Sequence, residues 1–116
     1  MALSTVCELF KANTPSAPQT PVSVADGGSV YIPAHGRTMV IGFTPTAAST
    51  VTVSKGDGVA AMNDLTFSAA ANKITFIQLD TSSFEFVDPD GAEKANLGSI
   101  KITATKGGTL VAVNAL

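Results

Sequence analysis

The sequence is poor in the residue types that build metal centres, disulfides and stacking platforms. It contains no tryptophan, one tyrosine, one histidine and one cysteine. Cys7 has no partner for an internal disulfide, which is consistent with folding in a reducing cytoplasm. A zinc site needs three or four histidine or cysteine ligands, and His35 and Cys7 supply only two. The sequence therefore predicts no metal site built from histidine or cysteine and no aromatic surface on which sugars or bases would stack.

Charged residues are also scarce. They make up 14% of the 116 residues, and the net charge is −2. A nucleic-acid-binding protein would normally carry a basic patch. No apolar run approaches the ~20 residues of a membrane-spanning helix, and the N-terminus lacks the basic start and apolar stretch of a signal peptide. Hydrophobic residues reach 45%, which excludes a disordered chain. We expect one folded domain with neither nucleic acid nor a membrane as partner.

The residues that are abundant indicate β-structure. Threonine, valine, isoleucine and phenylalanine recur in short runs, with apolar residues at every second position and Gly, Pro, Asn or Asp between the runs. This alternation is typical of antiparallel strands with one buried face. The sequence predicts an all-β fold, an antiparallel β-sandwich that is jelly-roll-like or immunoglobulin-like, with an N-terminal arm. The eight or nine expected strands lie in residues 22–24, 30–32, 37–44, 50–54, 65–68, 74–79, 84–86, 100–105 and 110–114, with Phe43, Phe67, Phe84 and Phe86 on inward faces.

The segments between these strands contain turn residues. Lys106-Gly107-Gly108 predicts a two-residue hairpin, because Gly-Gly supplies the positive φ values that such a hairpin needs. Asp88-Pro89-Asp90-Gly91 predicts a type I turn. Residues 92–96 are long enough for a single helical turn and no more.

The N-terminal region divides from the rest of the chain at a proline-rich stretch. Residues 13–21 contain three prolines and predict an extended, semi-rigid spacer. We therefore divide the chain into an arm or first strand (1–12), the spacer (13–21) and a β-sandwich domain (22–116). The arm carries too much apolar surface to remain in water. It is either the first strand of its own sandwich or an arm that docks on a neighbouring subunit or on a capsid, and its candidate contact residues are Leu3, Val6, Leu9 and Phe10.

Two of the expected strands carry apolar residues on both faces. In Ile74-Thr75-Phe76-Ile77-Gln78-Leu79 the alternation slips between Phe76 and Ile77, and residues 110–116 carry apolar side chains on both faces. Such a slip indicates either a β-bulge or a strand that is buried on both faces, under a loop or under another chain. Together with the low charge, the two strands favour contacts between copies of the chain.

Few residues suggest chemistry. His35 lies in an expected loop, and no Gly-x-Ser-x-Gly nucleophile motif accompanies it, so we interpret it as a solvated residue. The acidic residues Glu85, Asp88, Asp90 and Glu93 resemble the start of a calcium loop, but the third ligand and the distal glutamate of that loop are missing. Turn formation explains Asp and Gly at these positions equally well.

Two further patterns bear on binding. Lys55-Gly56-Asp57 matches an integrin-type tripeptide, yet a turn after the strand at 50–54 accounts for it. No glycine-rich phosphate-binding pattern is present. We therefore expect no catalytic residue, no cofactor and no enzymatic activity.

From Ser29 to Leu116 the chain resembles small phage and prophage structural proteins, of the head decoration (cement) or minor virion protein type. The resemblance covers about three quarters of the chain and depends on strand-and-turn motifs in a fixed order. These are Val30-Tyr31-Ile32-Pro33-Ala34, Gly36-Arg37 with the strand 39–44, the stretch 50–58, Asn63-Asp64-Leu65-Thr66-Phe67, Ile77-Gln78-Leu79-Asp80-Thr81-Ser82-Ser83-Phe84, the acidic loop, and Leu110-Val111-Ala112-Val113.

The resemblance implies a non-enzymatic virion protein that binds and stabilises the outer surface of a phage head. It implies the major capsid protein as partner, a homo-oligomer with a trimer favoured, and a place on the capsid surface after synthesis in the bacterial cytoplasm. Proteins of tails and fibres share such sandwich folds, so a tail- or fibre-associated module that binds a receptor or glycan is the alternative.

Overall fold

The computed structural model describes residues 22–33, 38–58 and 63–114, and the side chains of residues 113 and 114 are excluded. The expected arm (1–12) with Leu3, Val6, Leu9 and Phe10, the spacer (13–21) and His35 lie outside the described residues. The roles expected of these segments stay predictions, and the fold described below is that of the remaining residues.

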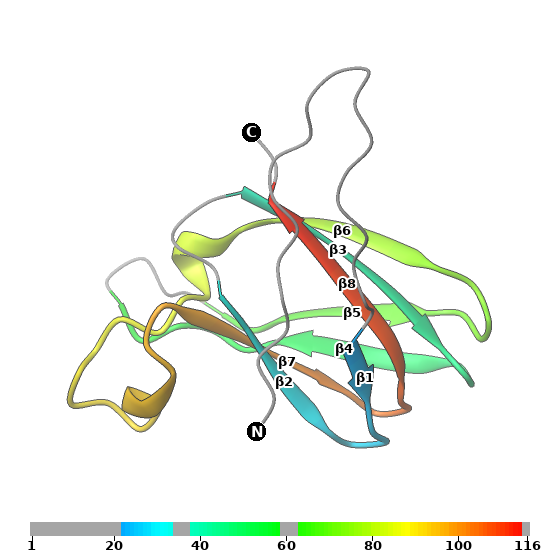
Figure 1. Cartoon of the computed structure of the whole chain (residues 1–116), viewed down its shortest axis with the longest axis horizontal. Coiled ribbons are helices and arrows are strands. Elements are labelled where there is room, and N and C mark those ends of the chain that lie inside the picture. Colours follow the sequence, from blue (N-terminus) through cyan, green and yellow to red (C-terminus); the bar gives the residue numbers. More distant parts are fainter. Residues whose placement is uncertain (1–21, 34–37, 59–62, 115–116) are drawn as a thin grey trace.

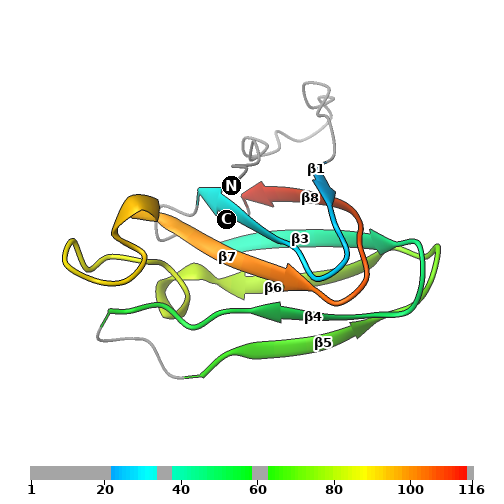
Figure 2. The same cartoon turned by 90° about the horizontal axis from the view of Figure 1, so that it is seen from below.

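The described residues form two antiparallel four-stranded sheets that pack face to face (Figures 1 and 2). One sheet has the order β1-β8-β3-β6 and the other has the order β2-β7-β4-β5. This architecture confirms the all-β sandwich predicted from the alternation of apolar residues. The strands are β1 (Val22–Val24), β2 (Ser29–Pro33), β3 (Thr38–Pro45), β4 (Ser49–Val53), β5 (Leu65–Ala69), β6 (Thr75–Asp80), β7 (Ser99–Ala104) and β8 (Gly108–Asn114).

The strand pairs are nested. β4 pairs with β5, β3 with β6, β2 with β7 and β1 with β8, as if one long hairpin had been rolled up until its two ends met. The pairs β3–β8 and β4–β7 then complete the two sheets. Eight strands in this double-sheet order form a jelly roll, whereas an immunoglobulin domain places its strands in a different order.

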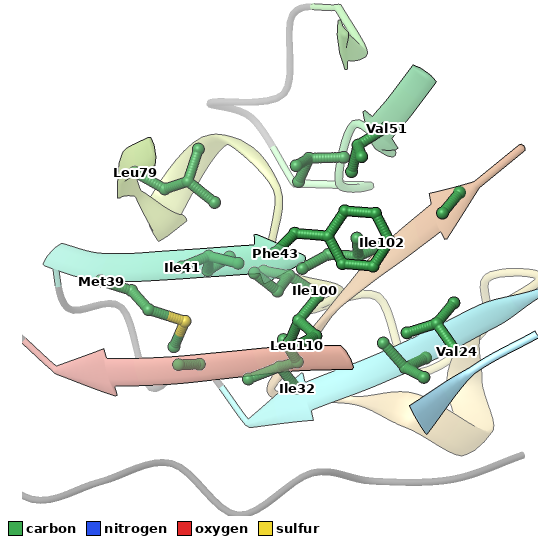
Figure 3. Close-up of a cluster of buried hydrophobic side chains, with 14 of the residues drawn as sticks. Val24, Ile32, Met39, Ile41, Phe43, Val51, Leu79, Ile100, Ile102 and Leu110 are labelled. Carbon is green, nitrogen blue, oxygen red and sulfur yellow. The ribbon is translucent and has the colours of Figure 1, made fainter. Parts of the chain in front are cut away.

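The hydrophobic core fills the space between the sheets. Phe43 is fully buried at its centre, with Ile41 beside it on β3 and Ile102 opposite on β7 (Figure 3). The inward positions of each strand alternate with outward ones, as the sequence predicts. Phe67 and Phe84 are half-buried and pack against the core cluster. The other core residues are Val24, Val30, Ile32, Met39, Val51, Val53, Ala69, Leu79, Ile100, Ala104, Leu110 and Ala112.

The irregular pattern of residues 74–79 does not come from a β-bulge. The register between β3 and β6 is unbroken from Thr38↔Asp80 to Phe43↔Thr75. Ile77 faces the core, while Phe76 faces outward and Ile74 precedes the strand. The slip in the sequence therefore marks a strand with apolar side chains on both faces.

The predicted hairpin at Lys106-Gly107-Gly108 is wrong. β7 and β8 belong to opposite sheets and do not pair, and neither Gly107 nor Gly108 has a positive φ. The glycines meet a different need, close packing of backbones. A Cβ atom on Gly107 would overlap the carbonyl oxygen of Val24, and one on Gly108 would overlap that of Thr44. The connection passes from one sheet to the other through a space that admits only glycine.

The predicted strand at residues 84–86 is also wrong. β6 ends at Asp80, whose carboxylate accepts hydrogen bonds from the backbone N–H of Ser82 at 3.1 Å and its hydroxyl at 2.8 Å. This cap starts a short 3-10 helix, η1 (Thr81–Ser83), and the chain then continues as a loop. Phe86 is buried, as expected, but it packs against Tyr31 on the outer side of β2.

Candidate functional site

All connections at one end of the sandwich are short, whereas the other end carries the two long ones, β4–β5 and β6–β7 (Figure 1). The β4–β5 and β6–β7 connections lie together at the long-loop end, where the N–H of Gly56 donates to the carbonyl of Ser83 at 3.0 Å. The jelly-roll topology therefore brings two of the segments that the sequence analysis singled out, 55–57 and 85–93, into contact.

The carboxylate of Asp57 fastens these two loops to each other. Its Oδ1 atom accepts the backbone N–H of Val87 at 2.7 Å and that of Asp88 at 3.1 Å. Asp57 therefore positions the β6–β7 loop. This structural role accounts for the aspartate of the Lys55-Gly56-Asp57 motif.

The acidic residues of the β6–β7 loop serve the loop itself. Gly91 donates its N–H to the carbonyl of Asp88 at 3.1 Å, which confirms the predicted turn, and the Asp88 carboxylate accepts the N–H of Asp90 at 2.9 Å. Glu93 accepts a hydrogen bond from the side chain of Asn96 at 3.3 Å, at the short 3-10 helix η2 (Lys94–Asn96) that fulfils the expected single turn. Within the described ranges, no three His, Cys, Asp or Glu residues are grouped as a metal site would require.

Tyr31 is the centre of a small cluster beneath this loop. Its ring packs against Phe86, with 6.3 Å between centroids, and the ammonium of Lys101 lies 6.0 Å from the ring centroid. The hydroxyl bonds to the side chain of Glu93. This bond, together with burial and the nearby carboxylate charge, raises the pKa of Tyr31 to about 12. The phenol donates this hydrogen bond to Glu93 and so helps to hold the loop, and the raised pKa keeps it protonated into the alkaline range.

Four large apolar side chains are exposed among the described residues, and they fall into two groups. Ile74 and Phe76 lie at the start of β6 and are 50% and 62% exposed. Val87 and Leu97 lie in the β6–β7 loop and are 52% and 46% exposed. Because β6 starts at the short-turn end and the loop lies at the long-loop end, the two groups occupy opposite ends of the sandwich (Figure 1).

Ile74 and Phe76 belong to a wider apolar surface. The register aligns Phe76 with Gly42 on β3, and Gly42 with Val111 on β8, so these three positions share the outer side of the β1-β8-β3-β6 sheet. A Cβ atom on Gly42 would lie 2.9 Å from the ring of Phe76 and 3.0 Å from Ile74. Both side chains therefore lean over the glycine, and Val40 extends the surface along β3. We call Val40, Gly42, Ile74, Phe76 and Val111 the β6 surface.

Val87 and Leu97 flank a backbone bridge within the loop. Phe86 donates its N–H to the carbonyl of Ser99 at 3.0 Å, and its own carbonyl accepts the N–H of Gly98 at 2.9 Å. Gly98 has a positive φ of 80°, a conformation that favours glycine. The bridge places Val87 and Leu97 next to each other in the fold. We call these two residues the loop surface.

No protein-family model, curated protein or solved structure matches the chain in the three comparisons. None of the described residues belongs to a helix that is long and apolar enough to cross a membrane. The function is therefore argued from the two apolar surfaces.

One of these surfaces is indicated by the sequence, and the other is not. Apolar residues on both faces of 74–79 indicated the β6 surface, and the register confirms that placement. The loop surface was missed because residues 84–86 were assigned to a strand. The motif Asp80-x-Ser82, which is typical of a side-chain cap, was the available signal that the strand ends earlier.

Proposed function

We propose that the chain is a non-enzymatic structural protein of a phage particle, a decoration protein that binds the outer surface of the head and stabilises the shell. The observation that supports this proposal most directly is the presence of two separate exposed apolar surfaces on one small sandwich. Exposed apolar groups of this kind are typical of protein–protein contact sites. The major capsid protein and further copies of the chain are the proposed partners.

A decoration subunit needs two contacts that do not compete, one with the shell and one with its neighbours. The β6 surface and the loop surface lie at opposite ends of the sandwich and satisfy this requirement (Figure 1). We assign the loop surface to the shell, because loops on a rigid scaffold are frequent binding sites and this loop is fixed in place by Asp57. We assign the β6 surface to contacts between copies, with a trimer favoured.

The mechanism of such a protein is passive. A subunit that binds only the assembled shell lowers the free energy of that state by mass action, by an amount that grows with its free concentration relative to its dissociation constant. The uncharged character of the β6 surface suits this role, since apolar contacts form without the cost of burying an unpaired charge.

Sedimentation of the purified protein with phage heads tests the proposal. We expect the full chain to co-sediment with heads that lack it, in a saturable manner, and to raise the temperature at which the heads open. Leu97→Ser should weaken this binding. The control is Leu65→Val, a conservative change of a half-buried side chain at the start of β5, and it should leave the binding unchanged.

Immunogold labelling of complete particles separates the two candidate locations. Gold over the head supports the proposal. Gold on the tail or its fibres, with no binding to isolated heads, would contradict it and favour the receptor- or glycan-binding alternative.

A further inference from the structure

β6 is an edge strand without the usual protection of an edge. It pairs with β3 on one side only, and it runs for six residues in an unbroken register. Lysine, proline or a bulge commonly blocks unwanted pairing at such an edge, and β6 has none of these within Thr75–Asp80. Its side chains are apolar on both faces, with Ile77 and Leu79 inward and Phe76 outward.

The other edge strands differ from β6. β1 is only three residues long, and β2 ends in a proline at Pro33. β5 directs Thr66 and Ser68 outward and exposes no large apolar side chain. Among the edges that the structure describes, β6 is therefore the one suited to receive an additional strand.

A strand added to this edge would need apolar residues on both of its faces, one to extend the core and one to cover Phe76. The N-terminal arm has this pattern when it is extended. Leu3 and Leu9 then fall on one face, while Val6 and Phe10 fall on the other. The arm contains no proline before the spacer, so each of its residues retains the N–H group that pairing requires.

The spacer is long enough for the arm to reach a neighbouring copy. β1 begins at Val22, opposite Leu110, and its sheet continues along β8 from Val111 to Asn114, a distance of about 14 Å. An extended proline-rich spacer of residues 13–21 spans about 28 Å. The arm is joined through this spacer to β1, which lies at the opposite edge of the sheet from β6, and a spacer of this length is long enough to reach the β6 edge of a second copy.

We propose that residues 3–10 of one copy add as a strand to the β6 edge of a second copy and cover its Ile74 and Phe76. Backbone hydrogen bonds supply the pairing, and the apolar residues of the arm supply the fit to this particular edge. The contact joins copies of the chain, so it holds whether or not the assembly binds a phage head.

Disulfide trapping with Cys7, the chain's single cysteine, tests this exchange in the full-length protein. The acceptor cysteine is introduced by Gln78→Cys, at an exposed outward position of β6. The acceptor chain also carries Cys7→Ser and a tag, and it is mixed with the untagged wild-type chain and mildly oxidised. The matched control is Thr66→Cys in the same background, which is exposed on the β5 edge.

We expect a disulfide-linked dimer of one tagged and one untagged chain with Gln78→Cys and little of it with Thr66→Cys. Equal trapping by both variants, or no trapping by either, would overturn the proposal. A second variant carries Gln78→Cys and keeps Cys7, so a disulfide can form either within one chain or between two chains. Covalent dimers and longer chains support exchange, whereas an internally linked monomer would show that the arm pairs with its own sandwich.

A binding measurement provides an independent check. Leu9 lies on the same face of the extended arm as Cys7, and Phe76 lies on the same face of β6 as Gln78. Leu9→Ser and Phe76→Ser should each raise the dissociation constant of the assembly by about tenfold or more, because each removes one half of the same apolar contact. The double variant should lose little more than either single variant. Fully additive losses would mean that the two residues act in different contacts, and the proposal would then fail. Head binding is measured separately, so failure here is distinguishable from failure of the proposed function.

Discussion

The two sheets of the sandwich present different outer faces to their surroundings. On the β2-β7-β4-β5 sheet, the largest aromatic side chain is Tyr31, and it is only 8% exposed because the β6–β7 loop covers it. On the β1-β8-β3-β6 sheet, Phe76 remains 62% exposed. Apart from Tyr31 and Lys101, the outward positions of the first sheet are mostly hydroxyl residues: Ser29, Thr50, Thr52, Thr66, Ser68, Ser99 and Thr103.

The difference shows that the outer face of the β2-β7-β4-β5 sheet is polar or covered by the chain itself, whereas that of the other sheet is not. The outward hydroxyl residues include a pair that bond to each other, Ser29 and Thr103 at 2.8 Å, and the outward ring of Tyr31 is covered by the chain's own loop. The described residues provide no such cover for Phe76. That side of the sandwich is the one on which we expect a partner to bind.

The largest expected effect concerns the core that both sheets share. Phe43→Ala should lower the free energy of unfolding by about 3–5 kcal/mol, because the ring is fully buried and leaves a cavity. Chemical denaturation measures this loss. Phe84→Ala is the comparison, and it should cost clearly less because Phe84 is half-buried and outside any strand. Equal costs would mean that the loop packs as tightly as the sheets.

A smaller loss is expected where the chain covers its own aromatic ring. Asp57→Ala removes the acceptor of two backbone N–H groups and should lower the free energy of unfolding by about 1–3 kcal/mol. Proteolysis within residues 84–98 should become faster, because the loop over Tyr31 is then held less firmly. Asp64→Ala removes one comparable bond, to the N–H of Lys55, and should leave cleavage of that loop unchanged.

On the opposite sheet, stability and association should separate. Phe76→Ser is expected to change the free energy of unfolding by less than about 1 kcal/mol, because the ring is mostly exposed in the isolated subunit. Dilution calorimetry or sedimentation should nevertheless show weaker association. A large loss of stability in the monomer, with association unchanged, would mean that Phe76 serves only to cover Gly42.

The last expected effect is confined to alkaline pH and concerns Tyr31. Its pKa is raised from 10.0 to about 12 in the folded state, so its contribution to stability is complete below pH 10 and is lost as the pH rises through 12. Tyr31→Phe should remove this part of the alkaline decline in stability. Absorbance titration of the single tyrosine follows the group directly, and a midpoint at the ordinary value would contradict the contact with Glu93.

The sequence predicted most of what depends on neighbouring residues. Alternation at Met39, Ile41 and Phe43 placed β3 and its buried face, because the two-residue period of a strand is a local property. The turn at residues 88–91 followed from the conformational preferences of Asp, Pro and Gly.

What the sequence could not predict depends on residues far apart in the chain. The pair Gly107-Gly108 predicts a hairpin when only its neighbours in sequence are considered. In the structure, glycine is needed there because the backbones of Val24 and Thr44 pass close by, and no local pattern reveals those contacts. The position of Phe86 against Tyr31 depends on the nested pairing of the strands. The two candidate surfaces differ in the same way. The apolar residues of β6 are neighbours in the sequence, whereas Val87 and Leu97 are brought together by the backbone bridge from Phe86 to Gly98 and Ser99.

Amide hydrogen exchange of the full-length protein tests the central claim, that the β6 side of the sandwich is completed by another chain. Exchange is compared between a dilute sample and a concentrated one. We predict that the amides of β6 that face away from β3 become protected as the concentration rises, while those on the open side of β5 do not change. Equal protection of both edges, or no change at β6, would contradict the account.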